Sequence, residues 1–232
     1  MSDNQIQSKL AEIEQVLNKR WPENKIEPTL DRISALVDAL GSPQLSYPTI
    51  HLAGTNGKTT TARMIDQLLA NLGYRVGRYT SPHLESFTER ISIKGEPISD
   101  AQMIATYKDI ELYLDLIDSR QPHPISYFEA LTAMAFVAFA EFPVDIAVIE
   151  AGLGGEWDAT NVLTSQVSVM TPIGFDHMEY LGDTLEKIAQ TKSGIFKPES
   201  NVVLAAQTPS VAKVLMEKVA KVSAIPFREG IE

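Results

Sequence analysis

The spacing of hydrophobic residues predicts two amphipathic helices at the start of the chain. Ile6, Leu10 and Ile13 recur at intervals of three and four residues, and a second apolar set with the same spacing runs over residues 29–41. Polar side chains occupy the positions between them. We therefore expect a helical lead-in over residues 1–47, followed by the main part of a domain that extends to the last residue of the chain.

Short apolar runs and longer helical segments alternate along the rest of the chain. The runs predict strands at residues 48–53, 75–79, 144–150, 167–171 and 201–206. The segments between these strands predict one helix that ends near residue 72, one over residues 99–119 and one over residues 126–141. Because strands that alternate with helices form a parallel sheet with both faces covered, the sequence predicts an α/β fold. We expect a doubly wound, mostly parallel sheet with helices on both faces.

Three predicted helices begin with a pattern typical of capping boxes. Ser99 precedes Gln102 by three residues, and Ser126 precedes Glu129 by the same interval. In such a box the two side chains satisfy free backbone N–H groups at the helix start. Asp183 stands in a similar pattern and is expected to cap the helix that follows it.

Composition limits the kind of partner that the protein can have. The 232 residues are 44% hydrophobic and 22% charged, as in a globular domain, and the net charge is −10. Nucleic acids and acidic membranes require a positive field, so neither is an expected partner.

The sequence has no cysteine, which suits a reducing cytoplasm. The start lacks the pattern of a signal peptide, and the most apolar stretch, residues 130–140, is too short to span a bilayer. We expect a cytoplasmic monomer.

A glycine-containing segment, H-L-A-G-T-N-G-K-T-T at residues 51–60, lies between a predicted strand and a predicted helix. Backbone N–H groups and the helix dipole converge on an anion at such a junction. Lys58 can reach phosphate oxygens, and Thr59 offers a hydroxyl near Mg²⁺. Leu52 replaces the first glycine of the G-x-x-x-x-G-K-S/T pattern, and a plain turn with a solvated lysine is the alternative. The predicted ATP-binding residues are Gly54, Thr55, Asn56, Gly57, Lys58, Thr59 and Thr60.

Polar side chains follow two later strands, where ligands bind in a doubly wound sheet. Glu150 ends one strand, and Asp176 and His177 follow the next. A carboxylate at that edge can hold a hard cation. By themselves these residues also fit a polar loop and a solvated histidine, and Lys192 fits a surface lysine near the end of a helix.

Several motifs, in order and spacing, resemble the folylpolyglutamate synthase/dihydrofolate synthase family of the Mur ligase superfamily. The resemblance covers residues 51–195 and is closest to the actinobacterial form. Besides residues 51–60, which we call the phosphate loop, it rests on Y-T-S-P-H-L at residues 79–84, E-R-I at 89–91, Y-F-E at 127–129, E-A-G-L-G-G at 150–155, D-A-T-N at 158–161, D-H at 176–177 and K-S-G-I at 192–195.

The resemblance implies a Mur-ligase central domain with a defined set of site residues. It implies that residues 56–59 bind the ATP phosphates, that Ser81 and Glu150 hold one Mg²⁺, and that His177 holds a second. It also implies that Lys192 is carbamylated by CO₂. The catalytic residues expected from the resemblance are Lys58, Lys192 and His177. The positions that match the dihydropteroate site are Ser126, Tyr127, Phe128, Trp157, Asp158 and Ala159.

The implied reaction is ATP-dependent amide formation. A carboxylate of dihydropteroate or folate is phosphorylated, and L-glutamate attacks the acyl phosphate. Family members are longer, and we expect the C-terminal glutamate-ligase domain to be absent from this chain. Two features differ from the family: Lys58-Thr59-Thr60 is closer to peptidoglycan Mur ligases, and Glu156 replaces a common arginine beside the substrate. A peptidoglycan Mur ligase domain and a non-catalytic nucleotide-binding module remain alternatives.

Overall fold

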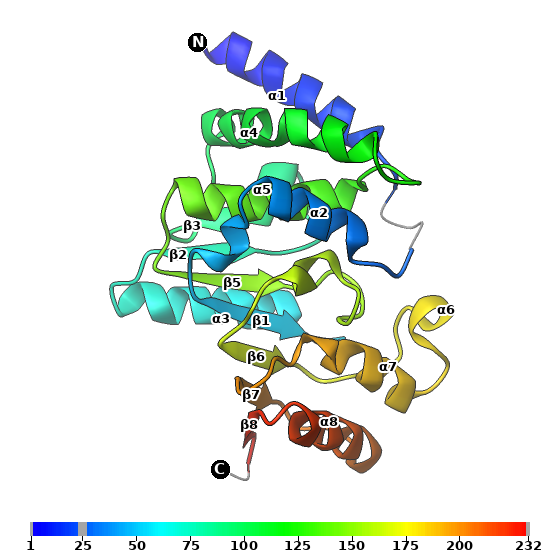
Figure 1. Cartoon of the computed structure of the whole chain (residues 1–232). Helices are drawn as coiled ribbons and strands as arrows, with labels where there is room; N and C mark the ends of the chain where they lie inside the picture. Colours follow the sequence, from blue (N-terminus) through cyan, green and yellow to red (C-terminus); the bar gives the residue numbers. More distant parts are fainter. Residues whose placement is uncertain (1, 23–26, 231–232) are drawn as a thin grey trace.

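A mostly parallel sheet lies at the centre of the protein. The computed structural model describes residues 2–22 and 27–230. The eight strands are arranged in the order β4-β3-β2-β5-β1-β6-β7-β8, and only the β2–β3 and β3–β4 pairs are antiparallel (Figure 1). The strands are β1 (Thr49–Ala53), β2 (Val76–Tyr79), β3 (Ile91–Ile93), β4 (Glu96–Pro97), β5 (Ile146–Glu150), β6 (Val167–Met170), β7 (Asn201–Leu204) and β8 (Ile225–Arg228). The predicted α/β fold is confirmed.

Helices cover both faces of this sheet. They are α1 (Asp3–Asn18), α2 (Asp31–Ala39), α3 (Lys58–Asn71), α4 (Asp100–Asp118), α5 (Tyr127–Glu141), α6 (Met178–Leu181), α7 (Leu185–Lys192) and α8 (Pro209–Lys221), with short 3₁₀ turns at Pro43–Leu45, Phe87–Arg90, Ala159–Val162 and Ser193–Ile195. Because side chains alternate along a strand, Ala147 and Ile149 of β5 face one core while Val148 faces the other. The second core lies beneath α3, and the first lies beneath α5.

The largest core joins the predicted lead-in to the sheet. Ile13 and Leu17 of α1 and Ile33 of α2 pack in the same cluster as α4 and α5. Figure 1 shows α4 between α1 and α5, with α5 next to the strands. The predicted apolar helix over residues 130–140 is confirmed as α5, whose side chains are nearly all buried. In the described part of the chain, no helix combines the length and the apolar character needed to cross a membrane.

Two of the three predicted helix caps are confirmed, and one is wrong. The Ser99 and Ser126 hydroxyls accept hydrogen bonds from the third residue of α4 and of α5 at 3.3 and 3.1 Å. At α7 the N-cap residue is Thr184, whose backbone is extended and whose hydroxyl accepts a hydrogen bond from the N–H of Lys187 at 3.3 Å. Asp183 is the residue before the N-cap position, so its side chain does not reach the free N–H groups of α7. It instead accepts a hydrogen bond from the Lys187 ammonium group at 2.8 Å.

Candidate active site

The phosphate loop joins β1 to α3 at the carboxyl edge of the sheet. Gly54 has a φ of 143°, which favours glycine. A Cβ at Gly54 would lie 2.0 Å from Oγ1 of Thr171 and 2.9 Å from the Thr171 carbonyl oxygen. The N–H groups of Thr55 and Asn56 both donate to the carbonyl oxygen of Pro172, at 3.1 and 3.2 Å. The loop is therefore held firmly against the segment that follows β6.

The first turn of α3 presents donors to an anion. Gly57 is the N-cap residue, with a φ of 82°. The N–H groups of Lys58, Thr59 and Thr60 follow it, and N–H groups in the first turn have no partner within the helix. The positive end of the helix dipole adds to their attraction for phosphate. The Lys58 ammonium group folds back over the loop and donates to the carbonyl oxygen of Gly54 at 3.1 Å.

Glu150 ends β5 and lies against the start of α3. Its side chain is buried, and the Thr59 hydroxyl lies 3.0 Å from both of its carboxylate oxygens. Burial raises the pKa of Glu150 to about 7, although Thr59, Lys58 and the backbone of Ser81 act in the opposite direction. A carboxylate removed from water in this way gains from a bound cation. Thr59, Ser81 and Glu150 offer the oxygen atoms that Mg²⁺ prefers.

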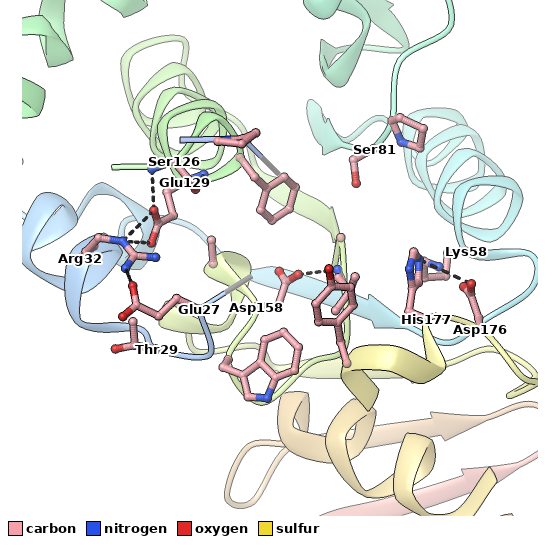
Figure 2. A pocket seen from close by; sticks show the side chains of 18 residues that line it. Glu27, Thr29, Arg32, Lys58, Ser81, Ser126, Glu129, Asp158, Asp176 and His177 are labelled. Carbon is pink, nitrogen blue, oxygen red and sulfur yellow. Dashed lines mark hydrogen bonds and ion pairs between the residues drawn. The ribbon is translucent and has the colours of Figure 1, made fainter. Parts of the chain in front are cut away.

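His177 is the N-cap residue of α6. Its φ of 46° is left-handed, its side chain is 47% exposed, and its Nε2 lies 3.5 Å from Asp176. Figure 2 places His177 and Asp176 beside Lys58. In residues 2–22 and 27–230, no cluster of three or more His, Asp or Glu side chains is arranged to hold a metal ion.

Lys192 is buried at the end of α7, and the alternative of a surface lysine is wrong. The residue is 2% exposed. Burial, followed by the nearby charge of Lys58, lowers the pKa of Lys192 to about 8, while Asp176 and Asp158 act in the opposite direction. A Cβ at Gly155 would lie only 2.4 Å from the Lys192 carbonyl oxygen. The G-G segment after β5 therefore packs directly on the backbone that carries the lysine.

A cavity of about 520 Å³ extends from the phosphate loop to α2. Figure 2 shows its two polar ends, with aromatic rings between them. The end near the phosphate loop contains Lys58, Ser81, Asp176 and His177; the walls contain Phe128, Leu153, Trp157 and Tyr180; the far end contains Glu27, Thr29, Arg32, Ser126 and Glu129. Such a cavity accepts an elongated ligand with one anionic end and a flat apolar body.

Phe128 forms one wall, whereas its neighbour Tyr127 lies outside the lining. The Phe128 ring packs on Gly152, where a Cβ would come within 2.5 Å of Cζ, and its centre is 6.1 Å from that of Tyr79. Tyr127 is largely buried and has the guanidinium carbon of Arg90 5.3 Å from its ring centre. Only Phe128 of the two can therefore stack on a ligand in this arrangement.

Asp158 links the cavity to β1 through a buried chain of hydrogen bonds. Its carboxylate accepts from the N–H and the hydroxyl of Thr160, at 2.9 and 2.5 Å, and from the N–H of Leu153 at 2.8 Å. His51 Nε2 lies 2.8 Å from the Thr160 hydroxyl oxygen. Burial lowers the pKa of His51 to about 3, so the ring is neutral. This chain fixes the loop that carries Trp157 and Asp158.

The comparison with known proteins agrees with this geometry. The Mur ligase middle domain family matches residues 52–230, which is most of the chain. The chain belongs to the Mur ligase family. Within this family it is similar to dihydrofolate synthase/folylpolyglutamate synthase of Mycobacterium tuberculosis, at 51% identity over 96% of this chain and 48% of the relative. The same enzyme of Bacillus subtilis is 40% identical over 88% of this chain and 47% of the relative.

Solved structures give the same result. Mycobacterium tuberculosis folylpolyglutamate synthase complexed with ADP matches with a TM-score of 0.92 and 51% identity over 98% of this chain and 51% of that one. E. coli FolC in complex with DHPP and ADP matches with a TM-score of 0.86 and 32% identity over 96% and 52%. The resemblance to folylpolyglutamate and dihydrofolate synthases is confirmed. This Mur ligase chain spans about half the length of these relatives.

The structure brings most of the predicted site residues of this Mur ligase chain to one edge of the sheet. Ser126, Phe128, Trp157, Asp158 and Ala159 line the cavity together with Lys58, Ser81 and His177. Glu150 and Lys192 lie buried just behind that surface. Glu156, the departure from the family pattern, is exposed and absent from the lining.

The sequence analysis missed four of the residues that line the cavity. Glu27, Thr29 and Arg32 come from the lead-in, and Tyr180 comes from α6. One signal was present in the sequence: Arg32 lies four residues before Leu36 and next to Ile33, on the buried side of α2. A charged residue on the apolar side of a helix needs a partner, and such a residue often marks a site.

Proposed function

We propose that this chain is the nucleotide- and pteroate-binding part of an ATP-dependent ligase. The whole enzyme joins L-glutamate to dihydropteroate or to folyl-polyglutamate. The observation that carries this proposal is one continuous cavity that runs from Lys58, at the start of α3, past the rings of Phe128 and Trp157. Its shape and lining suit a ligand with a carboxylate at one end and a flat ring system at the other.

The chemistry proceeds in two steps. An oxygen of the substrate carboxylate attacks the γ-phosphorus of ATP and ADP leaves, which gives an acyl phosphate. The amine of L-glutamate then attacks the acyl carbon, phosphate leaves, the amine loses a proton, and an amide remains. The contribution of this chain is to hold the phosphates at the α3 N-terminus and to stabilise their charge with Lys58. No protein nucleophile is required.

Two Mg²⁺ sites fit the residues at the sheet edge. Thr59, Ser81 and Glu150 would hold the first ion, and the buried Glu150 carboxylate would gain a counter-charge. His177 would bind the second ion from the α6 side of Lys58. When bound, these ions neutralise charge on the transferring phosphoryl group.

Lys192 is suited to carbamylation. The neutral amine attacks CO₂, forms an N–C bond and loses a proton, which leaves an anionic carbamate. The lowered pKa of Lys192 supports this step, because the reactive neutral amine is available near neutral pH. An anion at this position would also remove the repulsion between Lys192 and Lys58.

The relatives named above act in folate metabolism, which favours this proposal over a peptidoglycan Mur ligase. The two are separated by their substrates, since dihydropteroate and a UDP-muramoyl peptide differ in size and charge. A nucleotide-binding module without ligase chemistry would bind ATP. Such a module would not need the part of the cavity whose walls are Phe128 and Trp157.

The test is a calorimetric titration with a non-hydrolysable ATP analogue in Mg²⁺, followed by dihydropteroate. We expect both to bind. Lys58→Ala should weaken binding of the analogue by about 1.5–3 kcal/mol, roughly tenfold to a hundredfold, because a charged hydrogen bond to phosphate is lost. Lys108→Ala, which removes an exposed lysine of α4, is the control and should change nothing. Failure of dihydropteroate to bind while the analogue still binds would overturn the proposal.

A further inference from the structure

A buried ion pair joins α3, the helix that begins at the phosphate loop, to the strand β2. Arg78 of β2 donates from Nη1 to the carboxylate of Asp66 in α3 at 2.7 Å. Its Nη2 donates to the hydroxyl of Ser92, the residue beside it on β3, at 2.9 Å. The side chains of Asp66 and Arg78 are 0% and 9% exposed. One guanidinium group thus connects α3, β2 and β3.

The pair interrupts an interface that is otherwise apolar. Ala62, Ile65 and Leu69 of α3 pack in one core with β1, β2 and β5, and Asp66 is buried on the same side of the helix. Burial raises the pKa of Asp66 and lowers the pKa of Arg78, because both charges lose their hydration. Apolar residues in place of such a pair are often neutral or stabilising, so stability alone does not account for it.

The two elements that the pair joins carry two of the oxygen ligands proposed for the first Mg²⁺. Thr59 lies in the first turn of α3, and its hydroxyl contacts Glu150 at 3.0 Å. Ser81 comes two residues after the end of β2, and its backbone forms a hydrogen bond with Glu150. The oxygen atoms of Thr59 and Ser81 therefore reach one ion only when α3 and β2 hold one relative position.

Apolar packing and an ion pair differ in how well they fix that position. Burial of apolar surface is non-directional, so it tolerates a small shift of the helix along the strand. A charge-assisted hydrogen bond is short and directional, and at Arg78 two such donors hold Asp66 and Ser92 at once. The pair therefore sets the position of α3 along β2 more tightly than the apolar contacts around it.

We propose that Asp66 and Arg78 are positioning residues, whose ion pair fixes α3 against β2 and thereby fixes the two Mg²⁺ ligands that these elements carry. This inference rests on the proposed function, because it assumes the first Mg²⁺ site. Neither residue lines the cavity, so both act through the elements to which they belong. The α3 N-terminus and Lys58 attract phosphate without β2, so nucleotide binding in the absence of Mg²⁺ does not need the pair.

The test separates the effect of Mg²⁺ from the stability of the fold. Asp66→Leu/Arg78→Met replaces the pair by apolar side chains, and its unfolding midpoint in urea should stay the same or rise. Affinity for a non-hydrolysable ATP analogue is measured by calorimetry in EDTA and in saturating Mg²⁺. The affinity in EDTA should match that of the unmodified chain. The gain in affinity that Mg²⁺ gives should fall by roughly tenfold, because metal affinity depends on how the ligands are oriented.

Ile65→Val is the matched control. It removes one methyl group from the same interface of α3 and leaves the ion pair intact. The urea midpoint should fall, since a buried methyl group is lost, while the gain from Mg²⁺ should stay complete. If the double variant folds and keeps the full gain from Mg²⁺, or if Ile65→Val loses as much of it, the inference is wrong.

Arg78→Lys gives the answer if the double variant does not fold. Lysine keeps a positive charge beside Asp66 but lacks the rigid fork that holds Asp66 and Ser92 together. The gain from Mg²⁺ should fall in this variant, whereas an unchanged gain would overturn the inference. If the unmodified chain does not bind the analogue, or binds it equally in Mg²⁺ and in EDTA, the proposed function fails first and the inference fails with it.

Discussion

Lys192 and Lys58 place two positive charges at the same end of the cavity. Burial is the larger cause of the low pKa of Lys192, and repulsion from Lys58 adds to it. With a pKa of about 8, roughly a tenth of the side chain is neutral at pH 7, far more than for an ordinary lysine. Carbamylation requires such a fraction of neutral amine, because the ammonium form does not react with CO₂.

The carbamate can be observed directly. At fixed dissolved ¹³CO₂, we expect a carbamate carbon signal in NMR that grows as pH rises through about 8, because the amine loses its proton there. Below that pH the ammonium form cannot react. Lys192→Arg should remove one carbamate signal, and Lys197→Arg, at a second lysine whose pKa is lowered to about 8, should leave that same signal in place. A spectrum that Lys192→Arg leaves unchanged would rule out this assignment.

At the residue scale, the sequence predicted which polar residues gather at one edge of the sheet better than it predicted what surrounds each of them. Lys58, Glu150 and His177 could be found because motif and strand ends place them at one edge of the sheet. The burial of Lys192 could not be predicted, since it depends on the close backbone contact at Gly155, which joins segments far apart in the sequence. Arg32 was missed for the same reason, because its partner Glu129 is 97 residues away.

At the scale of elements, α7 positions Lys192, which is the last residue of this helix. The N-cap residue Thr184 stabilises the start of the helix. Thr184→Ala should lower the free energy of unfolding by about 0.5–2 kcal/mol, because the Thr184 hydroxyl satisfies the N–H of Lys187. Asp183→Ala should change it by less than about 0.5 kcal/mol, since the bond of Asp183 to the Lys187 ammonium group is exposed. Urea unfolding of the two variants measures the difference. Equal effects would contradict the assignment of the cap.

The predicted elements were correct where their patterns were long. The helices α4 and α5 are marked by capping boxes, and β1, β5 and β6 are marked by apolar runs, so each was found within two residues of its ends. The hairpin β3–β4 and the edge strand β8 were not predicted. They have only two to four residues each, too few for a hydrophobic period to emerge, and their existence depends on neighbouring strands.

Across the whole molecule, protection from solvent decreases from the centre of the sheet to β8. The strands β1 and β5 each bond to two neighbours, whereas β8 bonds only to β7, and its Ile225 and Phe227 are 54% and 47% exposed. Native-state hydrogen exchange should therefore be slower in β1 and β5 than in β8, because local opening requires less free energy in β8. Equal protection of β8 and β1 would contradict this order.

The strand order also determines when the phosphate loop can form. β1 pairs only with β5 and β6, and its residues meet partners that lie about a hundred positions later in the chain. During synthesis from the N-terminus, the segment that carries Lys58 leaves the ribosome long before either partner exists. Contacts of such long separation fold slowly and leave apolar strands exposed meanwhile. The residues that we propose to bind nucleotide are thus made early but gain their strand neighbours late, so the phosphate loop of the nascent chain is not held in place until β6 has emerged.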